Sequence, residues 1–137
     1  MALLVPDVGE VELLKRLLYS NAGSENLTLK LYSNNVTPAE SDTATTYTEA
    51  TFTGYAAKTL TSTQTGSTWG VPATVGGVTS STYGTAQVFS PTSSQTIYGY
   101  YVIGATSTVL LWAELFSSAK SLVSGDTLTV TPKLQLD

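Results

Sequence analysis

The stretch from Gln95 to Phe116 constrains the fold of this chain more than any other. It holds the longest apolar run of the sequence, three of its eight tyrosines and one of its two tryptophans. Aromatic and β-branched residues of this kind favour strands. Because the small residues Gly104–Ser107 divide the stretch, we predict two strands, Thr96–Ile103 and Thr108–Phe116, joined by a turn.

Two apolar patterns indicate how strands meet the core. Val109–Ala113 has no polar side, so we expect it to be covered on both faces, as in a central strand. Leu27–Tyr32 alternates instead, which directs Leu27, Leu29 and Leu31 to the core.

One helix is predicted, over residues 8–19. Its apolar positions follow helical rather than strand spacing, and Asp7 and Glu10 stand in capping-box spacing at its start. Two interpretations stay open for this helix. It packs its stripe on the chain's own sheets, or it docks on a partner protein together with the apolar arm Ala2–Val5.

The rest of the chain reads as short strands and turns. We predict strands at Tyr47–Glu49, Tyr55–Leu60, Thr85–Phe89 and Thr127–Leu136, a linker at Ser117–Ser121, and loops or short edge strands over Thr61–Ser81. Pro132 suggests an edge or a bulge in the last strand.

This pattern predicts a mainly β fold with one short N-terminal helix. About eight strands with regular turn signals indicate a two-sheet β-sandwich, jelly-roll-like in topology. Threonine and serine, 24 and 16 residues, replace much of the usual charge, which suits strands and turns with a neutral surface. We divide the chain into an N-terminal arm and amphipathic helix, 1–22, and one β-sandwich domain, 23–137.

Composition excludes several kinds of function. The chain has no cysteine and no histidine, which removes thiol nucleophiles, the usual zinc sites and histidine bases. Six basic residues and a net charge of -4 argue against a nucleic-acid partner. No apolar stretch approaches a bilayer's thickness and the start does not resemble a secretory signal, so we expect no membrane partner and a chain that is made and kept in solution.

Acidic and hydroxyl residues do not form a convincing reactive site. Glu40, Asp42 and Glu49 are the acidic cluster, but without a calcium-loop pattern we interpret them as solvated loop charges. Glu114, on the strand face of Trp112 and Phe116, lacks the second carboxylate of a glycosidase, and we expect it to pair with Lys58 or Lys120 or to lie at a rim.

The serine residues do not form a recognisable nucleophilic site either. Ser124-Gly125-Asp126 lacks a hydrolase context, and Ser117–Lys120 matches a Ser-Lys spacing alone. We therefore expect no catalytic residues, no cofactor, no metal and no enzymatic activity.

Exposed aromatic rings are a further candidate. Tyr98, Tyr100, Tyr101, Trp69 and Trp112 would suit a sugar-stacking platform, but core and interface packing is the favoured interpretation because alternation turns half of these rings inward.

Several segments together resemble a group of small β proteins encoded among the virion genes of tailed bacteriophages, cyanophages included. They are VPDVGE at Val5–Glu10, LTLKLYSNNVTPAE at Leu27–Glu40, GYA at Gly54–Ala56, YGYYV at Tyr98–Val102, LLWAE at Leu110–Glu114 and VTPKL at Val130–Leu134. The resemblance spans nearly the whole chain apart from Thr61–Ser94. Its motifs mark lineage rather than chemistry.

The resemblance implies a capsid decoration, or cement, protein. Such a protein lies on the capsid exterior and stabilises the assembled lattice of the major capsid protein as a symmetric oligomer, expected to be a homotrimer. The alternative is a tail or fibre component that binds a host receptor or glycan, with residues 61–81 as its contact surface. Our candidate partner contacts are apolar residues of the arm and helix with one isolated aromatic: Leu3, Leu4, Val5, Val8, Val11, Leu14, Leu18 and Trp69.

Overall fold

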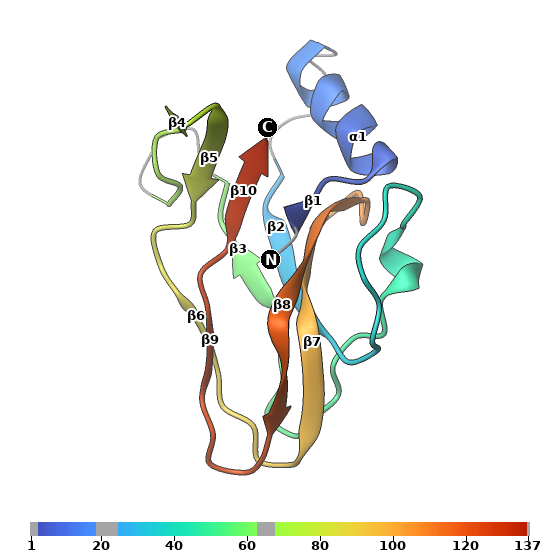
Figure 1. The fold of residues 1–137 in the computed structure, drawn as a ribbon, viewed down its shortest axis with the longest axis vertical. Coiled ribbons are helices and arrows are strands. Elements are labelled where there is room, and N and C mark those ends of the chain that lie inside the picture. The colour runs from blue at the N-terminus through green and yellow to red at the C-terminus, as the bar shows by residue number, and fades with distance from the viewer. Residues whose placement is uncertain (1–2, 19–24, 63–67, 137) are drawn as a thin grey trace.

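The computed structural model describes residues 3–18, 25–62 and 68–136. Over these ranges the chain is mainly β, with several antiparallel sheets and one short N-terminal helix, compatible with the predicted β-sandwich (Figure 1). The helices are α1, Asp7–Leu18, and the 3-10 helix η1, Ala44–Thr46. The strands are β1, Leu3–Leu4; β2, Leu27–Tyr32; β3, Lys58–Leu60; β4, Ala73–Val75; β5, Val78–Thr82; β6, Gln87–Phe89; β7, Gln95–Gly104; β8, Leu110–Leu122; β9, Leu128–Val130; and β10, Lys133–Leu136.

The central sheet has the strand order β1-β8-β7-β2-β3, with every neighbouring pair antiparallel. The predicted hairpin is its middle, as β7 and β8 in Figure 1. Val102 pairs with Trp112, and a register shift between Val102 and Ile103 leaves Leu111 as an extra residue opposite the turn end of β7. The expectation that this part of β8 is covered on both faces is confirmed, since Leu110–Ala113 are all buried.

Strand β8 is longer than predicted. The linker expected at Ser117–Ser121 is wrong, because this segment continues β8 to Leu122. Serine has no strong strand preference, but Gln95 and Ile97 of β7 pair here with Leu122 and Lys120 and carry the segment into the sheet. A large bulge separates this distal part from the apolar part of the strand.

A second layer packs on one face of the central sheet. It consists of the ladder β6–β9 and the three-stranded sheet β10-β5-β4. The strand predicted over Thr127–Leu136 is divided into β9 and β10 at Thr131 and Pro132. Proline cannot donate to a ladder, so the expected edge or bulge at Pro132 is a break between two strands. The Pro132 carbonyl accepts the Tyr83 amide at 2.8 Å, next to the start of the β5–β10 ladder.

Of the loops or short edge strands expected over Thr61–Ser81, the structure has short strands at the end of the segment, with β4 at the edge of its sheet. Strands β4 and β5 form a hairpin whose two-residue turn is Gly76-Gly77, with φ of 62° and 87°. Two consecutive positive φ angles are those of a type I′ turn, which glycine adopts without strain. Residues 63–67 lie outside the described residues.

Three predicted strands are shorter in the structure. Tyr47–Glu49 is an irregular segment with a single bridge from Glu49 to Tyr32, Tyr55–Leu60 is reduced to β3, and Thr85–Phe89 to β6. These segments contact a partner strand over only a few residues, so propensity alone overestimates their length.

The apolar side chains form two clusters, one on each face of the central sheet. The larger lies between the sheet and the second layer, and it includes Leu27, Leu29 and Leu31 as predicted. The smaller lies on the opposite face under the β2–β3 connection and contains Tyr32, Tyr47, Tyr101, Ile103, Leu110 and Ala113. Tyr47 stacks on Tyr101 with ring centroids 5.1 Å apart.

Helix α1 confirms the predicted helix, but its start differs in detail. Asp7 is the first helical residue, and the Pro6 carbonyl accepts the amides of Gly9 and Glu10 at 2.7 and 3.0 Å. The cap position is therefore Pro6 rather than Asp7. Residue 19, the predicted end, lies outside the described residues.

Candidate functional site

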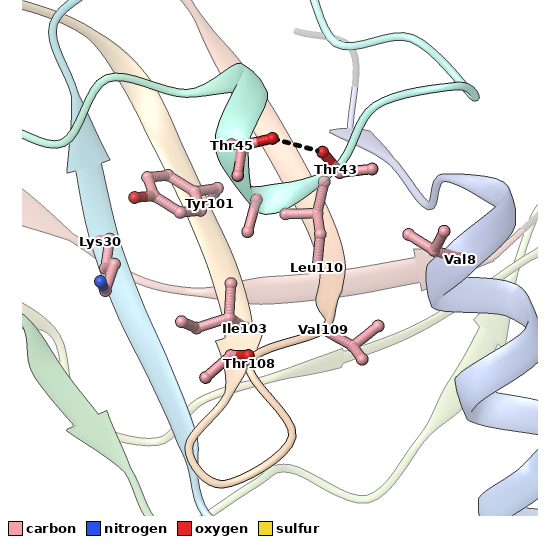
Figure 2. A pocket seen from close by; sticks show the side chains of 10 residues that line it. Val8, Lys30, Thr43, Thr45, Tyr101, Ile103, Thr108, Val109 and Leu110 are labelled. Atoms are coloured by element: carbon pink, nitrogen blue, oxygen red, sulfur yellow. Dashed lines mark hydrogen bonds between the residues drawn. The ribbon is translucent and has the colours of Figure 1, made fainter.

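An apolar groove lies on the face of the central sheet that the second layer leaves open. Its cavity volume is about 520 Å³. Figure 2 shows Tyr101 and Ile103 of β7 and Leu110 of β8 in this groove, between Val8 of α1 and Lys30 of β2. Thr43, Ala44 and Thr45 close it from the side of η1.

The groove continues onto helix α1. A neighbouring hollow of about 320 Å³ is lined by Val8, Val11 and Val109 and shares Val8 and Val109 with the groove. Val8 is 38 % exposed and Val11 51 % exposed. We call Val8, Val11 and Val109 the valine stripe.

The valine stripe is exposed because of how the helix docks on β8. Gly9 is buried, and a side-chain carbon placed on it would lie 2.5 Å from the Leu111 carbonyl oxygen and 3.0 Å from that of Leu110. The helix backbone therefore meets the strand backbone at Gly9, and the valines point away from that contact. Of the apolar stripe, Val8 and Val11 are exposed, whereas Leu13 lines a hollow together with Leu111 and Trp112. The side chains of the stripe residues from Leu14 onward lie outside the described residues, and both interpretations of the helix stay predictions.

Polar groups at the open end of the groove are already paired. The Lys30 ammonium donates to Glu49 Oε2 at 2.8 Å, and the Tyr55 hydroxyl donates to Glu49 Oε1 at 3.0 Å. Burial, and after it the charge of Glu49, raises the pKa of Tyr101 to about 12. Tyr101 is therefore a neutral, protonated part of the groove floor at physiological pH.

The turn that carries Val109 is fixed by Glu25, a residue that sequence reasoning missed. Its carboxylate accepts the amides of Thr106 and Ser107 at 2.5 and 2.9 Å and the Ser107 hydroxyl at 2.6 Å. Thr108 then adopts a φ of 57°, a left-handed conformation that is uncommon for a β-branched residue. A carboxylate just before a strand is too common a pattern to have revealed this role.

The predicted contact residues of the arm belong largely to the chain's own fold. Leu3 and Leu4 form β1 and pair with Glu114 and Ala113 of β8. Leu3 and Val5 pack against the larger core cluster. Val8 and Val11 remain as candidate contacts, whereas the side chains of Leu14 and Leu18 lie outside the described residues.

Trp69 is half-buried, and one part of its ring packs on the interior. Its ring lies edge-on to those of Tyr83 and Trp112, at centroid distances of 5.1 and 6.1 Å. Trp69 also packs against the larger core cluster. We therefore leave it out of the candidate surface.

The acidic cluster does not converge on a cation site. Asp42 is buried and accepts the Tyr47 hydroxyl at 2.8 Å and the Ala39 amide at 2.9 Å, while Glu49 pairs with Lys30 and Glu40 is exposed. Within the described residues, no group of three or more potential ligands is placed to hold a metal ion.

The remaining polar candidates have structural partners. Glu114 is buried and accepts the Tyr100 hydroxyl, so the expected pairing with Lys58 or Lys120 is wrong. Lys58 lies over the Phe89 ring instead. The Lys120 ammonium donates to Ser118 Oγ at 3.4 Å.

Asp126 accepts the Val123 amide at 2.9 Å and so holds the turn that follows β8.

The aromatic residues do not form an exposed platform. Tyr100, Tyr101 and Trp112 are buried, which confirms the favoured interpretation of core packing. Tyr98 and Trp69 are half-buried.

The groove and the valine stripe suit an apolar partner surface. Of the described residues that line them, charge is carried by Lys30, which is paired, and by Asp7 and Glu12 beside the stripe. An exposed apolar surface with a hydroxyl rim is typical of a protein contact.

Comparison with known proteins assigns no family. No family model matches the sequence, and no match was found among curated proteins. In the described parts of the chain, neither helix has the length and apolar character of a membrane-spanning segment.

Proposed function

We propose that this chain is a structural virion protein that decorates and stabilises a bacteriophage capsid. In this role it binds the assembled lattice of the major capsid protein on the capsid exterior, as a homotrimer. The class of protein that we propose comes from the sequence resemblance to phage virion proteins. Its structural support is a single observation: α1 docks through Gly9 and leaves Val8 and Val11 exposed beside an apolar groove.

The exposed valines explain how such binding would stabilise a shell. Apolar area buried on the lattice contributes about 25 cal/mol per Å². A ligand that binds the assembled state but not the free subunits shifts the equilibrium toward assembly, and many copies add their contributions. No reactive group is required for this function.

The test replaces the valine stripe on the helix. The double variant Val8→Ser/Val11→Ser should bind shells of the major capsid protein about tenfold more weakly or worse, because two side chains lose apolar burial at the contact. Sedimentation with shells assembled from the capsid protein encoded in the same genome measures the bound copies. Serine and valine have similar helix propensities, so the fold is retained.

A matched control is available on the opposite side of the molecule. Val71, just before β4, is 86 % exposed, and Val75, the last residue of β4, is 80 % exposed. The variant Val71→Ser/Val75→Ser should bind shells as the wild type does. Wild-type binding by the helix variant would contradict the groove as the contact. A wild-type protein that stays at the monomer mass of 14.4 kDa in light scattering and does not bind shells would contradict decoration itself.

A second candidate function is a tail or fibre component that binds a host receptor or glycan. The observation that favours it is the pair of exposed valines Val75, in the β4–β5 hairpin, and Val71, just before it. Copy number separates the two proposals, because a decoration protein is present in hundreds of copies per particle and a tail adhesin in a handful. Loss of glycan or cell binding in the Val71→Ser/Val75→Ser variant would favour the second candidate.

A further inference from the structure

We propose that a second cavity, built around Glu114, binds a small organic cation, an alkylammonium or guanidinium group. The cavity has a volume of about 240 Å³ and lies between the distal part of β8 and strand β9. It shares no lining residue with the groove, so this inference is independent of the proposed function.

Glu114 gives the cavity a buried carboxylate without a counter-charge. The residue is 7 % exposed, and the Tyr100 hydroxyl, directly across on β7, donates to its Oε2 at 2.5 Å. No described lysine or arginine forms an ion pair with it, and its Oε1 has no protein donor among the described residues. Burying a carboxylate is costly unless a cation or further donors compensate it.

The walls of the cavity complement a cation. Phe116 contributes a half-buried ring, 6.3 Å from the ring of Tyr100, and Thr129, Thr131 and Ser117 contribute hydroxyl groups. An ammonium group has three donors and no acceptor, so it can bind Glu114 Oε1 and a hydroxyl oxygen together. An aromatic face attracts a cation that lies over it. A neutral ligand gains neither the ion pair nor the attraction to the ring, and an anionic ligand is repelled by the carboxylate.

Lys120, the lysine of this chain that lines the cavity, does not form an ion pair with the Glu114 carboxylate. Its ammonium lies 3.4 Å from Ser118 Oγ instead. Lys120 therefore acts as a rim charge that weakens the binding of a second cation. Its removal should strengthen binding.

The size of the cavity fits a head group rather than a large ligand. Sites for drug-sized molecules occupy roughly 300 to 1,000 Å³, more than this cavity offers. Two sources supply the same chemistry: a free small amine, and a lysine or arginine side chain of a partner protein. The experiment distinguishes them.

The test is an NMR titration that follows the ring signals of Phe116 and Tyr100. We expect n-butylammonium chloride to shift them saturably and n-butanol, at the same concentrations and ionic strength, to leave them unchanged. Glu114→Gln keeps the acceptor for Tyr100 but removes the charge, and it should weaken binding about tenfold or more. Lys120→Ala should bind more tightly than the wild type.

A parallel titration with an end-blocked Gly-Lys-Gly peptide identifies the source. Tighter binding of the peptide than of butylammonium assigns a partner's side chain, and equal or weaker binding assigns a free amine. Should Glu114→Gln fail to fold, Phe116→Leu replaces it, with an expected loss of about threefold for the ammonium ligands. Equal affinity of the wild type and the variant used, or no saturable shift with either the wild type or Lys120→Ala, would overturn the proposal.

Discussion

Gly99 shows how a single residue sets the packing of the smaller cluster. It pairs with Tyr32 on one side and Leu115 on the other, next to the large bulge of β8. A side-chain carbon on Gly99 would collide with the Glu114 carbonyl oxygen and with the ring and hydroxyl of Tyr32. The missing side chain is the space into which the fully buried Tyr32 ring fits.

Replacing this glycine should therefore destabilise the protein. We expect Gly99→Ala to lower the free energy of unfolding by about 2 to 3 kcal/mol, the range typical of overpacking, as measured by urea denaturation. Gly70→Ala is the matched control, because its added carbon would lie 3.4 Å from the Thr82 carbonyl oxygen and should change stability by about 0.5 kcal/mol at most. Similar effects at the two sites would contradict this role of Gly99.

At the scale of elements, a close backbone contact holds α1 against β8. Gly9 meets the carbonyl oxygens of Leu110 and Leu111, whereas Val8 and Val11 lie outside the interface. Helical periodicity identifies an apolar stripe, but it does not say which face will touch the strand. Here the face that carries Gly9 touches the strand, because a residue without a side chain lets the backbones of α1 and β8 pack directly.

This contact reverses the usual effect of a glycine in a helix. Gly→Ala in a helix normally stabilises by about 1 kcal/mol, but Gly9→Ala should destabilise, because the new methyl group would lie 2.5 Å from the Leu111 carbonyl oxygen. Hydrogen exchange should show faster exchange of the α1 amides, with the β7 and β8 amides little changed. A more stable Gly9→Ala protein would show that α1 does not dock at this residue.

At the scale of the whole molecule, buried and half-buried tyrosines with raised pKa values lie on both faces of the central sheet. Burial is the largest cause of a raised pKa at five of the eight tyrosines: Tyr32, Tyr47, Tyr55, Tyr100 and Tyr101. Nearby carboxylates add to the effect, as Asp42 does at Tyr47 and Glu114 at Tyr100. The folded state thus favours the neutral phenol at both clusters.

The raised pKa values predict alkaline unfolding. Below the ordinary tyrosine pKa of 10.0 this contribution to stability is fully present, and it is lost as pH rises toward the folded-state values, about 12 for Tyr101 and higher for the other four. Denaturation followed from about pH 9 to 12 should show this fall, together with late, cooperative phenolate absorbance. Tyr101→Phe should have a shallower fall, and stability independent of pH over this range would contradict the prediction.

Local chemistry determined much of the architecture in advance. The hairpin of β7 and β8, the inward leucines of β2, helix α1 and the break at Pro132 all follow from patterns that act within a few residues. The sandwich class follows from them, because strands with one apolar face must bury it against another layer. The Gly76-Gly77 hairpin was not predicted, although two glycines between valines are a local turn signal.

Tertiary structure alone decided the pairing and the candidate sites. Ser117–Ser121 is a strand because β7 is there to pair with it, and β1 joins the sheet although its sequence resembles a free arm. The valine stripe is exposed because Gly9 sits against β8, and Glu114 is buried opposite Tyr100 rather than paired with a lysine. These outcomes depend on contacts between residues far apart in the chain, and such contacts leave no local periodicity for the sequence to display.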